Sequence, residues 1–188
     1  MLDFIGACQV ITIQTNVLVW TSRSTFMPLL TGGQKPLFSD DAKSVRQLAD
    51  TNFNPRREVY LPLEAKPFIT ATNVSVMKIS SEKFSAQQVE AKVETDTSAM
   101  LVAAQTYYHP WHAFVDGQPT RLWRANYAFQ ALEVPAGLHQ VKLVYEDRRF
   151  YLGVIISLTT LAGCFIFPCL ALRKYQQKKE SLPIGAQR

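Results

Sequence analysis

The sequence predicts a mainly β protein: an antiparallel β-sandwich, preceded by a small α/β part and followed by one transmembrane α-helix. Two observations predict this fold. Between about residues 68 and 146, short stretches of alternating apolar and polar residues are separated by turn-forming residues at regular spacing, which is typical of a sandwich. The run Phe150–Leu172 then contains no charged residue and is long enough to cross a bilayer as a helix.

Composition and charge exclude several classes of protein. The chain has 188 residues, of which 47% are hydrophobic and 19% charged, so it is not wholly disordered. Its three cysteines do not make a disulfide scaffold. Residues 1–147 carry 13 Lys and Arg against 14 Asp and Glu, whereas residues 148–188 carry 7 against 1. Because this basic excess brackets the apolar run, it indicates membrane flanks and predicts no nucleic-acid partner.

Four segments are expected along the chain: an α/β linker region at 1–66, the sandwich at 67–147, a transmembrane helix with basic flanks at 148–174 and a disordered tail at 175–188. The elements predicted in the first segment are a helical turn at 2–6, strands at Val10–Ile13, Val17–Trp20 and Val59–Leu61, a turn at Thr31–Gly33, and a helix from Asp40 or Asp41 to about Asp50. Val45 and Leu48 are expected to face the interior from that helix.

The second segment has the pattern of successive strands. Val89, Ala91 and Val93 alternate with charged residues, which predicts a half-buried antiparallel strand. The other strands expected are Thr72–Ile79, Ala99–Tyr107, Trp111–Val115, Arg121–Arg124, Tyr127–Val134 and Gln140–Glu146. Turns are predicted at Asp116-Gly117 and Pro135–Gly137, since glycine tolerates positive φ.

The basic residues around the apolar run predict its orientation. Two arginines precede it, and Arg173, Lys174, Lys178 and Lys179 follow it. Since the side richer in Lys and Arg is normally cytoplasmic, we expect the protein in the cytoplasmic membrane, with residues 1–149 outside and the tail inside. The N-terminus has no basic residue before its apolar part and no clear cleavage site. Export of such a domain then predicts that the chain is the end of a longer protein with earlier membrane spans.

No metal, cofactor or catalytic group is predicted. His109 and His112 have a spacing that suits a metal on a helix, but Pro110 forbids a helix there and no cysteine or carboxylate completes the ligand set. The aromatic residues between Tyr107 and Phe129 are dense, and most are expected in the core. The candidate ligand-contacting residues, for a sugar ring or a phosphate, are Tyr108, Trp111, Trp123, Arg124 and Asn126.

A series of short motifs runs from Tyr107 to Tyr151: an aromatic pair, a tryptophan, a Val-Asp-Gly turn, an Arg-x-Asn-Tyr segment, and a Pro-Ala-Gly-x-His turn before a strand that enters the apolar helix. The residues concerned are Tyr107, Tyr108, Trp111, Val115–Gly117, Arg124, Asn126, Tyr127, Pro135–Gly137 and His139. The series resembles the C-terminal module of YfhO-like bacterial membrane proteins, with His109-Pro110 in place of the usual Pro-Gly. Met27–Phe38 and Val59–Pro62 resemble their linker region.

The resemblance implies a polytopic protein similar to GT-C glycosyltransferases, which take sugars from polyprenyl-phosphate donors for cell-envelope polymers. The catalytic acid of that fold lies in an early extracytoplasmic loop that this sequence does not match, so no catalytic residue is carried over. We therefore expect a non-catalytic extracytoplasmic domain and last membrane helix. The expected partners are the lipid bilayer, other membrane helices of the same or a longer protein, and a polyprenyl-linked sugar or envelope glycan. Two alternatives stay open: a stand-alone, single-span sandwich that binds glycan or protein, and a degenerate reading frame.

Overall fold

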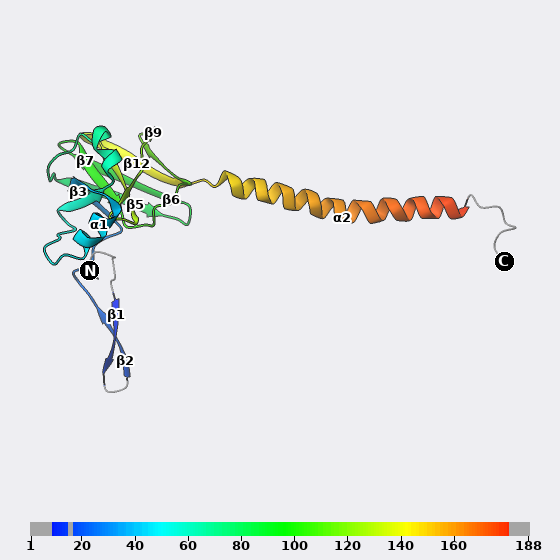
Figure 1. The fold of residues 1–188 in the computed structure, drawn as a ribbon, viewed down its shortest axis with the longest axis horizontal. Coiled ribbons are helices and arrows are strands. Elements are labelled where there is room, and N and C mark those ends of the chain that lie inside the picture. The colour runs from blue at the N-terminus through cyan, green and yellow to red at the C-terminus, as the bar shows by residue number, and fades with distance from the viewer. Residues whose placement is uncertain (1–8, 15–16, 181–188) are drawn as a thin grey trace. The chain divides into compact units, whose positions relative to one another are not determined.

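A computed structural model describes residues 9–14 and 17–180, so the helical turn expected at 2–6 lies outside the described residues (Figure 1). The chain divides into two compact units, one ending at Glu146 and the other beginning at Asp147. The first unit holds the strands and the second holds one long helix.

The first unit contains two five-stranded sheets. One sheet has the order β10 (Trp123–Ala125), β11 (Phe129–Val134), β7 (Ala99–Ala103), β3 (Leu30–Phe38), β4 (Glu58–Leu61). The other has the order β5 (Met77–Phe84), β6 (Gln88–Thr95), β12 (Gly137–Tyr145), β8 (Trp111–Val115), β9 (Gln118–Thr120). In these two sheets only β3 and β4 pair in parallel. Helix α1 (Asp41–Leu48) lies between them in sequence, as a parallel connection requires. The predicted sandwich with an α/β N-terminal part is therefore confirmed.

The main core lies between the two sheets. Leu30, Leu101 and Leu132 of the first sheet pack with Val93 and Leu143 of the second in one buried cluster. These side chains come from alternate positions of their strands, because successive residues of a strand face opposite sides. The alternation expected at 89–93 is confirmed, since Val89, Ala91 and Val93 are all buried.

A second cluster covers the other face of the first sheet. Met100 and Val102 pack there with Val59, Leu61 and Ala65, the last from the short 3-10 helix η1 (Leu63–Phe68). Strand β7 is central and is covered on both faces, so all of its residues are buried. The boundary expected between residues 66 and 67 remains a prediction, but strands from both sides of it share this sheet.

Several predicted elements need correction. Thr31–Gly33 is not a turn but part of β3, where the register shifts between Gly32 and Gln34 in a bulge. The strand expected from Thr72 begins only at Met77. The strand expected to reach Tyr107 ends at Ala103. Val45 is 46% exposed, because α1 buries Ser44 instead. Glycine pairs suit both turns and bulges, so the sequence alone does not separate the two.

An N-terminal hairpin forms a sheet of its own, as the two predicted strands indicate. It consists of β1 (Gln9–Gln14) and β2 (Val17–Ser22), paired antiparallel. Ile11 and Ile13 lie opposite Trp20 and Leu18, and all four side chains are exposed. The hairpin therefore adds little to the core of the sandwich.

Helix α2 (Arg148–Glu180) contains the apolar run and is the long helix coloured yellow to red in Figure 1. Asp147 accepts hydrogen bonds from the backbone N–H groups of Arg149 and Phe150 and so caps its first turn. The stretch Arg148–Lys174 has the length and hydropathy of a membrane span. The hydroxyl of Thr160 donates to the carbonyl of Ile156, as hydroxyls do in apolar surroundings. The helix continues into the tail expected to be disordered, because its Lys and Gln residues are good helix formers.

Candidate functional site

A cavity of about 530 Å³ opens on the sandwich and has the size of a small-molecule site. Five segments line it: Phe68–Thr70 at the end of η1, Ser98 between β6 and β7, the β8–β9 hairpin with Arg121 after it, Trp123 of β10, and the β11–β12 hairpin with its turn. The hairpin and the turn are those predicted at Asp116-Gly117 and Pro135–Gly137. Gly117 and Gly137 have positive φ angles, which confirms why glycine was expected in both turns.

One wall of the cavity is a stack of two aromatic rings and a cation. The rings of Phe68 and Trp123 are stacked with centroids 5.9 Å apart. The guanidinium carbon of Arg121 lies 3.6 Å from the Phe68 centroid and 5.9 Å from that of Trp123. Cation–π attraction therefore holds Arg121 against the aromatic wall.

Glu133 fixes the segment that carries Phe68. Its Oε1 accepts three hydrogen bonds, from the backbone N–H of Thr70 (2.9 Å), the hydroxyl of Thr70 (2.7 Å) and the backbone N–H of Ala71 (2.6 Å). A carboxylate that receives several donors makes strong, charge-assisted hydrogen bonds. Strand β11 thus holds the chain after η1 in place beside the cavity.

Asp116 and His139 join the two turns at the cavity. Nδ1 of His139 lies 2.6 Å from Oδ2 of Asp116, and Nε2 of His139 lies 3.1 Å from the carbonyl oxygen of Ala136. Oδ1 of Asp116 also accepts a hydrogen bond from the backbone N–H of Gln140 (2.8 Å). Both ring nitrogens of His139 therefore face acceptors, an arrangement that only the doubly protonated ring satisfies.

These contacts shift both pKa values in the expected directions. The hydrogen bonds to Asp116, first, and to the Ala136 carbonyl raise the pKa of His139 above 6.5. The backbone N–H of Gln140 and then His139 lower the pKa of Asp116 below 3.8. At neutral pH the carboxylate is ionised and the imidazole is more easily protonated than a free one.

We expect this ion pair to make stability depend on pH. Because folding raises the pKa of His139, its contribution is fully present below 6.5 and is lost as the pH rises through the folded-state value. The melting temperature of the full chain in detergent should therefore fall between about pH 5.5 and 8.5. It should fall by more than the melting temperature of the His139→Asn variant does. Equal pH dependence in the two proteins would contradict the pairing. Asp116 stays ionised over this range, since its pKa is lowered.

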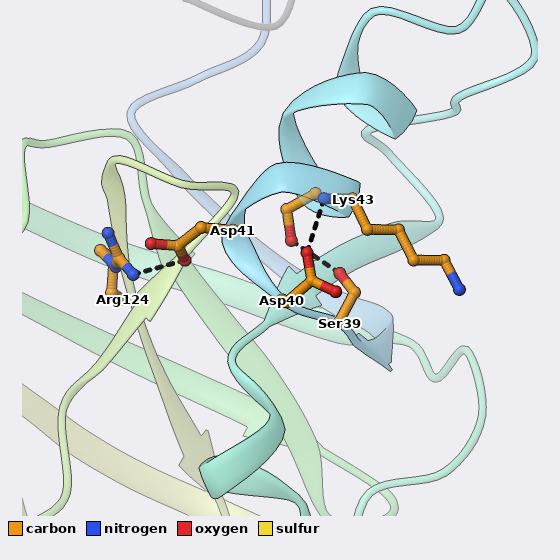
Figure 2. Close-up of polar contacts among 6 residues, drawn as sticks. Ser39, Asp40, Asp41, Lys43 and Arg124 are labelled. Atoms are coloured by element: carbon orange, nitrogen blue, oxygen red, sulfur yellow. Dashed lines mark hydrogen bonds and ion pairs between the residues drawn. The ribbon is translucent and has the colours of Figure 1, made fainter.

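Arg124 takes part in a separate cluster on the first sheet. Its guanidinium pairs with Asp41 at 2.5 Å and lies 5.6 Å from the ring centroid of Tyr127. Figure 2 shows this pair beside the start of α1, where Asp40 accepts a hydrogen bond from the backbone N–H of Lys43. The Asp41 carboxylate raises the pKa of Arg124. Arg124 thus connects β10 to α1, and it is not among the residues that line the cavity.

Asn126 links β10 to β4. Its side-chain oxygen accepts a hydrogen bond from the backbone N–H of Tyr60, and its own backbone N–H donates to the Tyr60 carbonyl, both at 2.8 Å. Asn126 is 5% exposed and has φ 47°, a conformation that asparagine adopts more readily than most residues. These contacts account for an asparagine at this position without a ligand.

Trp111 is buried in the main core, where its ring packs edge-on against Tyr145. Tyr108 is 50% exposed and its ring lies 4.4 Å from that of His109. Of the five predicted ligand-contacting residues, only Trp123 lines the cavity, and ligand contact by any of them stays a prediction. The cavity brings in Phe68 and Arg121, which sequence reasoning did not select. Phe68 lies before the aromatic-rich stretch and is distant in sequence from Trp123, so no sequence pattern indicated that the two rings stack.

The described side chains contain no group of three His, Cys, Asp or Glu residues placed to hold a metal ion. Comparison with known proteins gives a more specific result. The model of a family described as "Bacterial membrane protein YfhO" matches residues 66–157. Residues 66–157 are a YfhO-like region. No curated protein matches the chain.

The YfhO-like region begins in η1, covers β5 to β12 and extends into α2. It contains the whole stretch Tyr107–Tyr151 on which the resemblance depends, so that resemblance is confirmed. It also contains every residue that lines the cavity. The YfhO match and the apolar run of α2 both support a membrane-associated role. The resemblance of Met27–Phe38 to a linker stays a prediction, because it lies outside the match.

Proposed function

We propose that this chain is the non-catalytic extracytoplasmic domain and last membrane helix of a YfhO-like polytopic protein. That protein transfers sugars from polyprenyl-phosphate donors to cell-envelope polymers. The observation that carries the proposal is the family match, which runs from the sandwich into the apolar helix. In this role the sandwich positions the polymer acceptor, and α2 joins the other membrane helices.

The cavity supports a role in glycan handling. It combines an aromatic wall, Phe68 and Trp123, with hydroxyl and amide side chains such as Thr120 and Gln118. Carbohydrate sites need both, since the C–H face of a sugar packs on an aromatic ring while its hydroxyls require hydrogen-bond partners. The same cavity also suits the alternative, a stand-alone single-span module that binds glycan.

A genetic experiment tests the proposed function. In the bacterium that carries this gene, deletion of its coding region should lower the sugar content of an envelope polymer and raise the amount of polyprenyl-phosphate-linked sugar. Both should be measured after metabolic labelling with radioactive sugars, with the native gene restored on a plasmid as the control. Unchanged labelling of both fractions would contradict the proposal.

An immunoblot of native membranes separates the two architectures. An antibody raised against residues 101–147 should detect a band several times larger than 21.2 kDa if the sandwich belongs to a polytopic protein. A band near 21.2 kDa would favour the single-span module instead. Protease added to spheroplasts should remove the antibody epitope in both cases, because the proposed orientation, which the Lys and Arg counts support, has the sandwich outside.

A further inference from the structure

The cavity contains four ionisable side chains, and three of them are already engaged. Asp116 and His139 are hydrogen-bonded to each other, and the second ring nitrogen of His139 lies at the Ala136 carbonyl. Glu133 keeps its negative charge, but its Oε1 receives the three donors of Thr70 and Ala71. Arg121 is the fourth ionisable side chain of the cavity, and it takes no part in these contacts.

Arg121 has no carboxylate partner within ion-pair distance in the described parts of the chain, in contrast with Arg124 on the nearby strand. Its guanidinium carbon lies 3.6 Å from the Phe68 ring centroid, and this contact restrains a side chain that is otherwise exposed. A guanidinium restrained by an aromatic ring keeps its N–H donors at its edge, where they match the paired oxygens of a carboxylate or phosphate.

We propose that the cavity binds a sugar ring that carries an anionic group, with the anion on Arg121 and the ring against Phe68 and Trp123. The inference rests on the proposed function, because it names the part of the glycan that the sandwich binds. The anionic group is a phosphate or a carboxylate on the sugar. When His139 is protonated, the two positive and two negative groups of the cavity balance, so recognition is local to Arg121 and does not come from a broad positive field.

The polar lining suits the remainder of a sugar. Ser98 and Thr120 bring hydroxyl groups to the cavity, and Gln118 brings an amide. These groups both donate and accept, as the hydroxyls of a pyranose require. Phe68 is 50% exposed, so its ring still offers apolar surface beside Arg121.

Isothermal titration calorimetry on the full chain in lipid nanodiscs tests the inference. The probes are glucose 1-phosphate, glucuronic acid, glucose and inorganic phosphate. Glucose 1-phosphate or glucuronic acid should bind at least about tenfold more tightly than glucose and than phosphate alone, since a charge-assisted hydrogen bond adds to the contacts of the ring. Whichever charged sugar binds more tightly identifies the anion as phosphate or carboxylate. Equal binding of the charged sugars and glucose, or no binding of any sugar, would overturn the inference.

Arg121→Gln should lower the affinity for the charged sugar about tenfold, to that of glucose, while the affinity for glucose itself stays the same. The matched control is Arg46→Gln, which removes another exposed arginine, from α1, that does not line the cavity. Melting temperatures of both variants show whether they are folded, and Arg121→Lys provides a second variant that keeps the charge but loses the planar fork. Unchanged affinity in folded Arg121→Gln would overturn the inference.

This experiment and the genetic one fail independently. If deletion of the gene leaves envelope sugars unchanged while the purified chain binds a charged sugar through Arg121, the proposed function is wrong and the site is right. If deletion changes the sugars while no charged sugar binds, the site is wrong and the proposed function is right.

Discussion

Replacing Gly33 with alanine is expected to destabilise the sandwich by about 2–5 kcal/mol. Gly33 has φ +84°, a region that costs an alanine about 1–2 kcal/mol. A Cβ built on it would lie 2.0 Å from the carbonyl oxygen of Ser75, which is backbone and therefore cannot rotate away. The backbone N–H of Ser75 also donates a hydrogen bond to the Gly33 carbonyl (2.9 Å), which holds the two segments together. Relief of the clash would have to separate the bulge of β3 from the chain before β5.

Gly117→Ala is the matched control for this prediction. Gly117 also has a positive φ, +77°, but nothing lies within 4 Å of an added Cβ. Its substitution should therefore cost only the conformational part, about 1–2 kcal/mol. Urea unfolding of the full chain in detergent, followed by circular dichroism, measures both variants. If Gly33→Ala costs no more than Gly117→Ala, the close approach at Ser75 is not present in solution.

Trp111→Ala should destabilise the protein by about 3–5 kcal/mol. Trp111 is 8% exposed, belongs to the cluster between the sheets and packs against Tyr145 with ring centroids 5.5 Å apart. Alanine would remove most of a large buried side chain from the edge of the core and leave a cavity that the two sheets close only in part. The same unfolding measurement gives the loss of stability.

Trp20→Ala provides the comparison for Trp111. Trp20 is 65% exposed on the N-terminal hairpin, so its removal should change stability by no more than about 0.5 kcal/mol. Similar small effects of both substitutions would place Trp111 on the surface and return it to the candidates for ligand contact.

Short-range patterns predicted most of the secondary structure. Alternation at Val89, Ala91 and Val93 indicated a strand with one buried face, because side chains of a strand alternate with period two. Asp40 indicated the start of α1, because its side chain accepts a hydrogen bond from the Lys43 backbone three residues on. At Gly32-Gly33 the same residues are compatible with a turn and with a bulge. Pairing with β7 selects the bulge, so the predicted turn was wrong.

The candidate site was less predictable than the fold for a related reason. Trp123 was selected from an aromatic-rich stretch, but Phe68 and Arg121 complete its wall only because η1 and the β8–β9 hairpin meet β10 in space. Trp111 and Trp123 have similar sequence surroundings, yet one is in the core and the other lines a cavity. Such a difference depends on which sheet face each strand presents to its neighbour.

Local sequence patterns were enough to predict the β-rich domain, its α/β beginning, the long apolar helix and the YfhO-like region, because periodicity, turn residues and an uncharged apolar run are local properties. The folded structure was needed to show that Asp116 pairs with His139, that Arg124 is held by Asp41, and that Arg121 has no carboxylate partner among the described residues. Those contacts join residues far apart in the chain, and the packing of strands and loops decides which charged groups meet and which remain available to a ligand.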